Sequence, residues 1–378
     1  MAKLQKGYPF FFEYIDFINY CFGMNGTTHA FDKLLPKLYA NNKSSGNDTY
    51  FALENDKIIG TVLAYPLTFS VAGKTLSARG IGSVATHPRY RGEGFMKKLM
   101  KKALDDMVKD RIAFAVLGGR RGRYRHFGFE KCDAMTYYAL TPKTVSYLQP
   151  DTEGYSIREI KRDDTKLLNL LHIHMHKRPY YTVRPRKELF DILVSWQSTP
   201  YAYFKGDTLV GWAIHYRSKR QLSEFEYLNP SDVPAMLALS TARFGDISVA
   251  VPVYEKEKAA LIDPYAENVT SVSNECFLVL DWLTTLDALF SLQKESRPLC
   301  DGKMTVEIEG YQRTVTLTVT VKNGIPAVYE GGTPELTLTL PEAELFFFRN
   351  IAPKRTAVSP EAASWLPLPL FIHECDNV

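Results

Sequence analysis

Apolar and charged residues in the N-terminal part of the chain alternate in a way that predicts a β-hairpin. Residues 50–68, YFALENDKIIGTVLAYPLT, contain two apolar runs around a charged turn, which is the pattern of two antiparallel strands. We predict a further strand at about 78–86. The continuous apolar run RIAFAVLGG at 111–119 suits a strand that is buried on both faces. This part of the chain is therefore expected to build a sheet.

A helix is predicted to follow that third strand, because apolar residues recur from Phe95 onward at helical spacing and lysines fill the positions between them. Such a pattern gives a helix with one buried stripe and a charged outer face. The apolar positions after Phe95 are Met96, Leu99, Met100, Ala103, Leu104 and Met107.

A second hairpin pattern at 201–218, YAYFKGDTLVGWAIHYRS, echoes the first and predicts a duplicated fold. Thr, Pro, Gly and Ser are concentrated in TPKTVSYLQPDTEG, which begins at residue 141 and indicates a domain boundary. Nothing between 219 and 270 repeats the arginines and glycines that stand at 89–94. We therefore expect the second copy to lack the chemistry of the first.

Alternating positions near the C-terminal end predict a half-exposed antiparallel sheet. Asn323-Gly324 is the preferred dipeptide of a type I′ hairpin turn, and it follows the alternation directly. The final segment, SWLPLPLFIHECDNV, combines prolines with large apolar groups and is expected to be a docked, non-helical tail. The apolar members of the alternation are Val315, Leu317, Val319 and Val321.

The composition is that of an ordinary folded protein, and the charge does not indicate a nucleic-acid-binding surface. Of the 378 residues, 45% are hydrophobic and 23% are charged, and the net charge is only +4. The 5 cysteines are widely spaced without a CxxC pair, as expected of buried thiols in a reducing compartment. The N-terminus has no signal-peptide core and no stretch approaches a membrane span. We expect a cytoplasmic protein that binds neither nucleic acid nor a membrane.

The stretch ATHPRYRGEGFMKKLM, at 85–100, places glycines and arginines at the start of the predicted helix. The first N–H groups of a helix lack intrahelical partners and carry the positive end of its dipole, so they can bind phosphate. Gly92 and Gly94 would let the backbone wrap around a pyrophosphate, and Arg89 and Arg91 would add positive charge. Taken alone, these residues could also form a plain strand-loop-helix joint with solvated arginines.

Two motifs in this order resemble those of the GCN5-related N-acetyltransferases (GNATs). The spacing Arg89-x-x-Gly92-x-Gly94 resembles their motif A, whereas it fits neither a Rossmann GxGxxG nor a Walker loop. Downstream, RYRHFGFEKC at 123–132 contains Tyr-x-x-Phe-Gly-Phe, which resembles the closing signature of the same family.

The resemblance implies a site for acetyl-coenzyme A between two splayed strands. Tyr124 matches the family's general acid, which returns a proton to the departing thiolate; a core tyrosine with a hydrogen-bonded hydroxyl is the alternative. No metal is expected. The residues implied to pair with the pantetheine arm are Val84, Ala85 and Thr86. The residues implied to hold the pyrophosphate are Arg89, Arg91, Gly92, Glu93, Gly94, Phe95 and Met96.

The overall layout resembles the Eis (enhanced intracellular survival) acetyltransferases. It predicts an α+β fold with a GNAT domain at 1–145, a second GNAT-like domain without the motif at 146–272, and a sterol-carrier-like domain at 273–378. In that family the terminal carboxylate acts as general base, which implies this role for Val378. A homo-oligomer, a hexamer by resemblance, is also implied.

The acceptor is expected to be a primary amine, on an aminoglycoside-like polyamine or a lysine side chain. Glu374 and Asp376 could attract a cationic acceptor. An acyltransferase of the N-myristoyltransferase type and a non-enzymatic lipid carrier are the alternative functions. A further alternative, a metal site in HIHMH at 172–176, is disfavoured because that segment reads as helical and no carboxylate or cysteine completes a site nearby.

Overall fold

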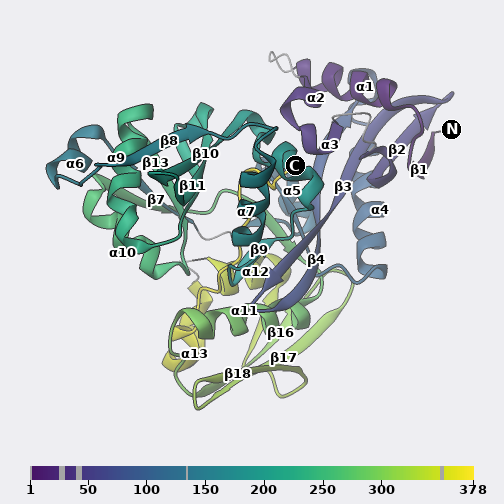
Figure 1. Ribbon diagram of the computed structural model, residues 1–378. Coiled ribbons are helices and arrows are strands. Elements are labelled where there is room, and N and C mark those ends of the chain that lie inside the picture. The colour runs from purple at the N-terminus through teal and green to yellow at the C-terminus, as the bar shows by residue number, and fades with distance from the viewer. Residues whose placement is uncertain (1, 25–29, 40–44, 133–134, 350–352) are drawn as a thin grey trace.

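The computed structural model describes residues 2–24, 30–39, 45–132, 135–349 and 353–378. Within these ranges the strands form three sheets (Figure 1), with the first two side by side and the third below them in the view. No helix in this described part of the chain is long and apolar enough to cross a membrane.

The strands of the first sheet are β1 (Lys3–Lys6), β2 (Thr49–Glu54), β3 (Lys57–Val71), β4 (Lys74–Thr86), β5 (Phe114–Leu117), β6 (Glu130–Lys131), β9 (Tyr180–Thr182) and β15 (Cys276–Val279). Those of the second are β7 (Met135–Leu140), β8 (Tyr155–Glu159), β10 (Ser198–Lys205), β11 (Thr208–Tyr216), β12 (Gln221–Tyr227), β13 (Ile247–Pro252) and β14 (Asn268–Val272). Those of the third are β16 (Gly302–Glu309), β17 (Thr314–Lys322), β18 (Ile325–Glu330) and β19 (Leu336–Thr339).

The α-helices are α1 (Phe11–Gly23), α2 (Phe31–Leu34), α3 (Pro36–Tyr39), α4 (Phe95–Lys109), α5 (Arg121–Tyr124), α6 (Pro142–Tyr147), α7 (Thr165–Met175), α8 (Leu189–Leu193), α9 (Val233–Phe244), α10 (Lys256–Ile262), α11 (Trp282–Ser296), α12 (Leu340–Phe348) and α13 (Pro360–Ser364). The 3₁₀ turns that bear on the site are η3 (Pro88–Tyr90) and η6 (Ser195–Gln197).

The first sheet contains the strand pair that opens the site. Its order is β1-β2-β3-β4-β5-β15-β6, with β9 against β3, and β4 and β5 run parallel. Their pairing ends at Gly80 opposite Val116, although β4 continues to Thr86, so the two strands splay apart. The predicted hairpin, third strand and buried strand are thus confirmed as β2 to β5, and α4 buries the predicted stripe except for Met96, which is half-buried.

The second sheet repeats this arrangement. Its run β10-β11-β12-α9-β13 has the order of β2-β3-β4-α4-β5, and β12 pairs with β13 in parallel over only two residue pairs. The predicted second hairpin is β10 and β11. Such a repeat is consistent with the predicted duplication.

Two strands pair in a different sheet from the one that the predicted domain boundaries would give them. β7 belongs to the second sheet although it precedes residue 145, and β15 belongs to the first sheet although it follows residue 272. The predicted division at 145 and 272 follows composition, whereas pairing is decided by contacts far apart in the chain. The division into three domains stays a prediction.

The third sheet has the order β18-β17-β16-β19. The four predicted apolar positions on β17 are buried, and Asn323 and Gly324 turn the chain into β18 with φ angles of 53° and 72°. This confirms the predicted hairpin, since a type I′ turn needs positive φ at both positions. Helix α11 packs against β18 and against β3 and β4, so it connects this sheet with the first.

The C-terminal tail after α13 has no regular helix, as predicted, and it is docked. Trp365 is fully buried, and the Gln293 side-chain amide donates to its carbonyl at 2.7 Å. The Tyr180 hydroxyl donates to the carbonyl of Phe371 at 2.6 Å, and the two rings stack. The tail therefore runs from the third sheet back toward the first.

Candidate active site

A bulge in β4 lies at the splay between β4 and β5. The register shifts between Thr61 and Leu63, and Ser83 adopts a φ of 45° there. The Thr61 hydroxyl donates to the Ser83 carbonyl at 2.7 Å, and the Ser83 hydroxyl lies 2.6 Å from that of Tyr39. Since a bulge leaves a residue out of the ladder, the strand beyond Ser83 can pair with a ligand.

A cavity of about 370 Å³ follows the bulge. It adjoins the strand segment that the sequence assigned to the pantetheine arm, and it extends to the start of α4. Of the predicted phosphate residues, Arg91 and Met96 line it, whereas Arg89 and Glu93 are exposed outside it. The complete lining is Cys21, Phe22, Val84, Ala85, Thr86, Arg91, Met96 and Arg123.

The loop before α4 has the backbone that close approach to a phosphate needs. Gly92 and Gly94 have φ angles of 89° and 77°, a region that side chains disfavour. A Cβ at either position would meet nothing within 4 Å, so both face open space. Phe95 is buried and fixes the first turn of α4. The backbone N–H groups of that turn are thus available to an anion.

A second cavity of about 560 Å³ contains both predicted catalytic residues. Tyr124 and Val378 line it, and it shares Phe22, Val84 and Arg123 with the first cavity, so the two adjoin. The complete lining is Phe22, Phe31, Leu34, Leu35, Ile81, Gly82, Ser83, Val84, Gly118, Gly119, Arg120, Arg123, Tyr124, Trp196 and Val378.

The Tyr124 side chain is buried against a glycine. It is 7% exposed, and a Cβ added to Gly119 would lie 2.9 Å from its ring atom Cε2. Burial raises the pKa of the phenol, although Arg123 opposes the shift. At neutral pH the hydroxyl therefore keeps its proton and can donate it.

Val378 occupies a space that two glycines of β4 leave open. Gly80 and Gly82 point to the same face because they are two residues apart in a strand. A Cβ on Gly80 would lie 2.5 Å from Val378 Cγ2, and one on Gly82 would lie 3.1 Å from the α-carboxyl carbon. The sequence interpretation missed these glycines, although the pattern Gly-x-Gly within a strand could have indicated a close approach.

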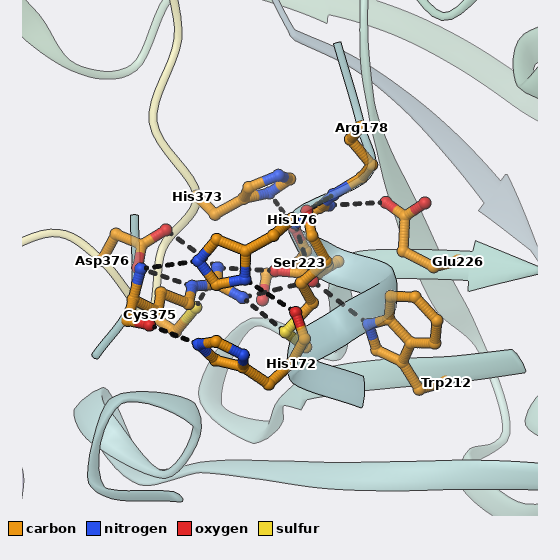
Figure 2. Close-up of polar contacts among 12 residues, drawn as sticks. His172, His176, Arg178, Trp212, Ser223, Glu226, His373, Cys375 and Asp376 are labelled. Carbon is orange, nitrogen blue, oxygen red and sulfur yellow. Dashed lines mark hydrogen bonds and ion pairs between the residues drawn. The ribbon is translucent and has the colours of Figure 1, made fainter. Parts of the chain in front are cut away.

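The residues that precede Val378 are held by charged and polar groups. Asp376 accepts from Arg184 at 2.9 and 2.8 Å, and Glu374 lies 3.4 Å from Lys219. Asp376 is 3% exposed and does not line the larger cavity. Arg184 also donates to Cys375 Sγ at 3.1 Å, and its main chain contacts His172 and His176, so the tail and these histidines of α7 meet at this arginine (Figure 2). The geometry thus gives Asp376 an anchoring contact.

Several groups near the tail carry no sequence signal. Lys37, Arg184 and Trp196 contact the tail from separate segments, so no local spacing could have revealed them. Glu275 is a fourth case, since its Oε2 and the Asn377 side chain both lie against Gly118. Burial and the nearby Glu374 raise the pKa of Glu275 to about 7.

The three histidines of HIHMH lie on and just after α7, as the helical interpretation predicted. His172 Nε2 lies 3.0 Å from the Arg184 carbonyl, and His176 Nδ1 lies 2.7 Å from the His172 carbonyl. Among the residues that the structure describes, no group of three or more His, Cys, Asp or Glu side chains could hold a metal ion.

Comparison with known proteins identifies the N-terminal part of the chain. Residues 10–132 match the family described as acetyltransferase (GNAT) domain. A search of curated proteins by sequence finds no match.

Solved structures share the fold over almost the whole chain. A GCN5-related N-acetyltransferase from Anabaena variabilis superposes with a TM-score of 0.69 at 16% identity, covering 99% of this chain and 98% of that one. Eis1 from Mycobacterium abscessus gives 0.64 at 14% identity, with coverage of 99% and 98%. A probable N-acyltransferase from Enterococcus faecalis V583 gives 0.67 at 18% identity, with coverage of 92% and 90%.

The two predicted motifs lie inside the matched region, and the predicted likeness to Eis proteins agrees with the fold of Eis1. An enzyme of the GNAT fold takes its acyl group from an acyl-coenzyme A and passes it to an amine acceptor. The chain therefore carries a GNAT acetyltransferase domain, within a larger fold that it shares with Eis1 and other GCN5-related N-acetyltransferases.

Proposed function

We propose that the protein transfers an acetyl group from acetyl-coenzyme A to a primary amine by direct attack. The observation that carries the proposal is that Tyr124 and Val378 line one cavity, which adjoins the cavity lined by Val84, Ala85 and Thr86. A proton donor and a carboxylate thus meet next to the splayed strand. This is the constellation that acyl transfer to an amine requires.

In the proposed complex, coenzyme A occupies the smaller cavity. Its pantetheine arm pairs with β4 beyond Ser83, where β5 no longer supplies hydrogen bonds. A backbone N–H of this segment polarises the thioester carbonyl. The pyrophosphate lies on the N–H groups at the start of α4, with Arg91 beside it.

The reaction then needs one base and one acid. The α-carboxylate of Val378 removes a proton from the acceptor ammonium, and the free amine attacks the thioester carbon. The tetrahedral intermediate collapses with loss of the C–S bond, and Tyr124 donates its proton to the thiolate of coenzyme A. The nitrogen, which became positively charged on attack, gives its surplus proton to the Tyr124 phenolate and so restores the acid. The products are the acetylated amine and free coenzyme A.

The side chains that line the larger cavity indicate which class of amine acceptor fits it. They are mainly apolar and aromatic, and Arg120 and Arg123 are the charged side chains among the described lining residues. A volume of about 560 Å³ suits a small organic ligand. Within the proposed class, which includes aminoglycosides and lysine side chains, these walls favour an amine on an apolar or aromatic body. Acceptor contacts by Glu374 and Asp376 stay predictions, and neither residue belongs to the lining of this cavity.

The domain division and the oligomeric state are proposed from the likeness to Eis proteins. We infer GNAT, GNAT-like and sterol-carrier-like domains at 1–145, 146–272 and 273–378, and a homo-oligomer. In this proposal the third domain serves the chemistry by delivering the tail, because α13 leads directly to the segment that ends beside β4.

The test is to move the carboxylate without changing any side chain of the first sheet. Deleting residues 376–378 removes it, whereas appending several residues converts the Val378 carboxylate into a neutral amide. Both variants should bind acetyl-coenzyme A normally in calorimetry, while kcat/KM for a panel of amines falls by about 10²-fold or more. Near-normal turnover in the extended protein would remove Val378 from the mechanism.

A further inference from the structure

Lys37 of α3 is a buried lysine that contacts the tail. It is 3% exposed, and its Nζ donates to the carbonyls of Cys375 at 2.8 Å and Asn377 at 2.6 Å. A buried ammonium is costly unless hydrogen bonds compensate it. Both bonds go to main-chain oxygens, so the ammonium fixes the path of the tail without depending on tail side chains.

Trp196 of η6 converges on the same carbonyl. Its indole Nε1 donates to the oxygen of Asn377 at 2.9 Å. Trp196 and the following Gln197 have φ angles of 60° and 58°, which are unfavourable for residues with side chains. Two such residues in succession persist only where the surroundings enforce them, and such strain is concentrated at functional sites.

The Asn377 side chain completes the arrangement. Its Oδ1 accepts from the backbone N–H of Val378 at 2.9 Å. The carbonyl of Asn377 is thus held by two donors, and the next peptide N–H is held by its side chain. These contacts fix the orientation of the bond that carries the α-carboxylate.

We propose that Lys37 is a positioning residue, whose ammonium acts with the Trp196 indole to hold the Asn377 carbonyl and thereby keep the Val378 α-carboxylate beside β4. Its catalytic consequence rests on the proposed function, because it matters for turnover only if that carboxylate is the base. Its structural consequence, a tail held closed, does not depend on the chemistry.

The contacts between Lys37 and the tail should persist in mildly alkaline solution. Burial lowers the pKa of Lys37 to about 8, against the attraction of Asp376, Cys375 and Glu374 in the tail, while Arg184 adds to the lowering. Tyr65, which lines the same small cavity as Lys37, has its pKa raised to about 12 and keeps its proton in this interval. Opening the tail would admit water to Lys37 and return its pKa toward the ordinary value, so the closed form loses this proton first as the pH rises.

The global fold should not weaken in this interval either. Because the folded-state pKa of Lys37 lies below its unfolded value, folded chains lose this proton first as the pH rises. The contribution of Lys37 to the free energy of unfolding therefore increases between pH 8 and the unfolded pKa near 10.4. The free energy of opening the tail should change in the same direction, because opening exposes Lys37 as unfolding does.

Carboxypeptidase release of Val378 measures the hold directly, because the enzyme needs a freed end. The rate is followed by mass spectrometry and normalised to cleavage of the free peptide FIHECDNV. In the unaltered protein, the normalised rate should not rise between pH 7 and 9.5, because above pH about 8 the closed form binds fewer protons than the open form. A normalised rate that rises across this interval would overturn the burial of Lys37 under the closed tail.

Variants test whether Lys37, rather than another group, holds the tail. Lys37→Met keeps chain length but loses the charge and the donor, and should speed release at pH 7 by about 10- to 100-fold. Trp196→Phe keeps an aromatic ring but loses Nε1, and serves if Lys37→Met does not fold. Lys33→Met, on the exposed side of the neighbouring helix α2, is the matched control and should leave the rate unchanged.

The rate of Val378 release and kcat/KM together distinguish the positioning role of Lys37 from the role of the Val378 carboxylate as base. Faster release with a lower kcat/KM supports the positioning role and the proposed base. Faster release with unchanged kcat/KM upholds the hold on the tail but overturns Val378 as the base. Unchanged release in both Lys37→Met and Trp196→Phe overturns the positioning role, whatever their activity.

Discussion

At the scale of single residues, both proposed catalytic groups lie against glycines. Tyr124 packs over Gly119, and Val378 packs over Gly80 and Gly82. Since glycine has no Cβ, a reacting group can approach the backbone that binds the thioester more closely than any other residue would allow. The distance between acid, base and strand is thus determined by the absence of side chains.

Tyr124→Phe tests the acid. The ring should keep its place against Gly119 and Phe129, while the proton donor is lost. We expect kcat to fall by about 10² to 10⁴ with unchanged affinity for acetyl-coenzyme A, measured by steady-state kinetics and calorimetry. Tyr147→Phe is the control, because the Tyr147 side chain is 85% exposed. Turnover near the unaltered level would exclude Tyr124 as the acid.

Gly82→Ala tests the space reserved for the tail. The new Cβ would lie 3.1 Å from the Val378 α-carboxyl carbon, which is closer than ordinary van der Waals contact, so the carboxylate must shift. A displacement of this kind should lower kcat/KM by about 10²-fold with little change in melting temperature. Gly23→Ala is the control, because its Cβ would meet nothing within 4 Å. Normal kinetics in Gly82→Ala would show that the carboxylate is not needed at this position.

At the scale of elements, the sequence predicts what is encoded locally. Alternation and turn residues located β2 to β5, α4, the second hairpin and the Asn323-Gly324 turn, because each depends on neighbours along the chain. The exchange of β7 and β15 was not predicted, since an apolar run makes a strand without specifying its partner. The same limit applies to the site. Motif A and Tyr124 are local, whereas Lys37 and Trp196 meet the tail only in the folded chain.

Gly92→Asp tests the loop before α4 as an element that binds phosphate. A carboxylate at this position would repel the pyrophosphate and hinder its approach to the N–H groups. Calorimetry should show no binding of acetyl-coenzyme A. Gly73→Asp is a matched control, because Gly73 has a φ of 76° and open space around its Cβ position but lies in the turn between β3 and β4. If both variants bind equally well, the loop does not hold the phosphate.

At the scale of the whole molecule, β12 of the second sheet helps to hold the tail that ends beside β4 of the first sheet. The tail passes the short parallel pairing of β12 with β13, where His373 Nδ1 lies 3.3 Å from the Ser223 carbonyl. Arg184 pairs with Glu224 of β12 at 2.8 Å and with Asp376 of the tail. The second sheet, whose segment of the chain lacks the phosphate motif, thus anchors the segment that ends beside β4.

Asp376→Asn tests this anchoring at the level of the fold. Burial alone would raise the pKa of Asp376, but the Arg184 guanidinium outweighs it and lowers the pKa below its usual value. Its stabilising contribution is therefore present above the unfolded pKa of about 3.9 and is lost as the pH falls through the lower folded value. Removing one partner of a buried ion pair should cost about 3 kcal/mol at pH 7, at the lower end of the usual range because Glu224 still pairs with Arg184.

Denaturant unfolding of the unaltered protein and of Asp376→Asn should give curves that differ at pH 7 and approach each other below pH about 3.9. The double variant Arg184→Met, Asp376→Leu separates stability from position. It leaves no unpaired charge, since Glu224 keeps Arg178 at 3.4 Å, so much of the lost stability should return. Its kcat/KM should nevertheless stay low, because the ion pairs that join the tail to β12 through Arg184 are lost. Recovery of both stability and kcat/KM in the double variant would show that the contact of the tail with Arg184 and β12 does not position the Val378 carboxylate.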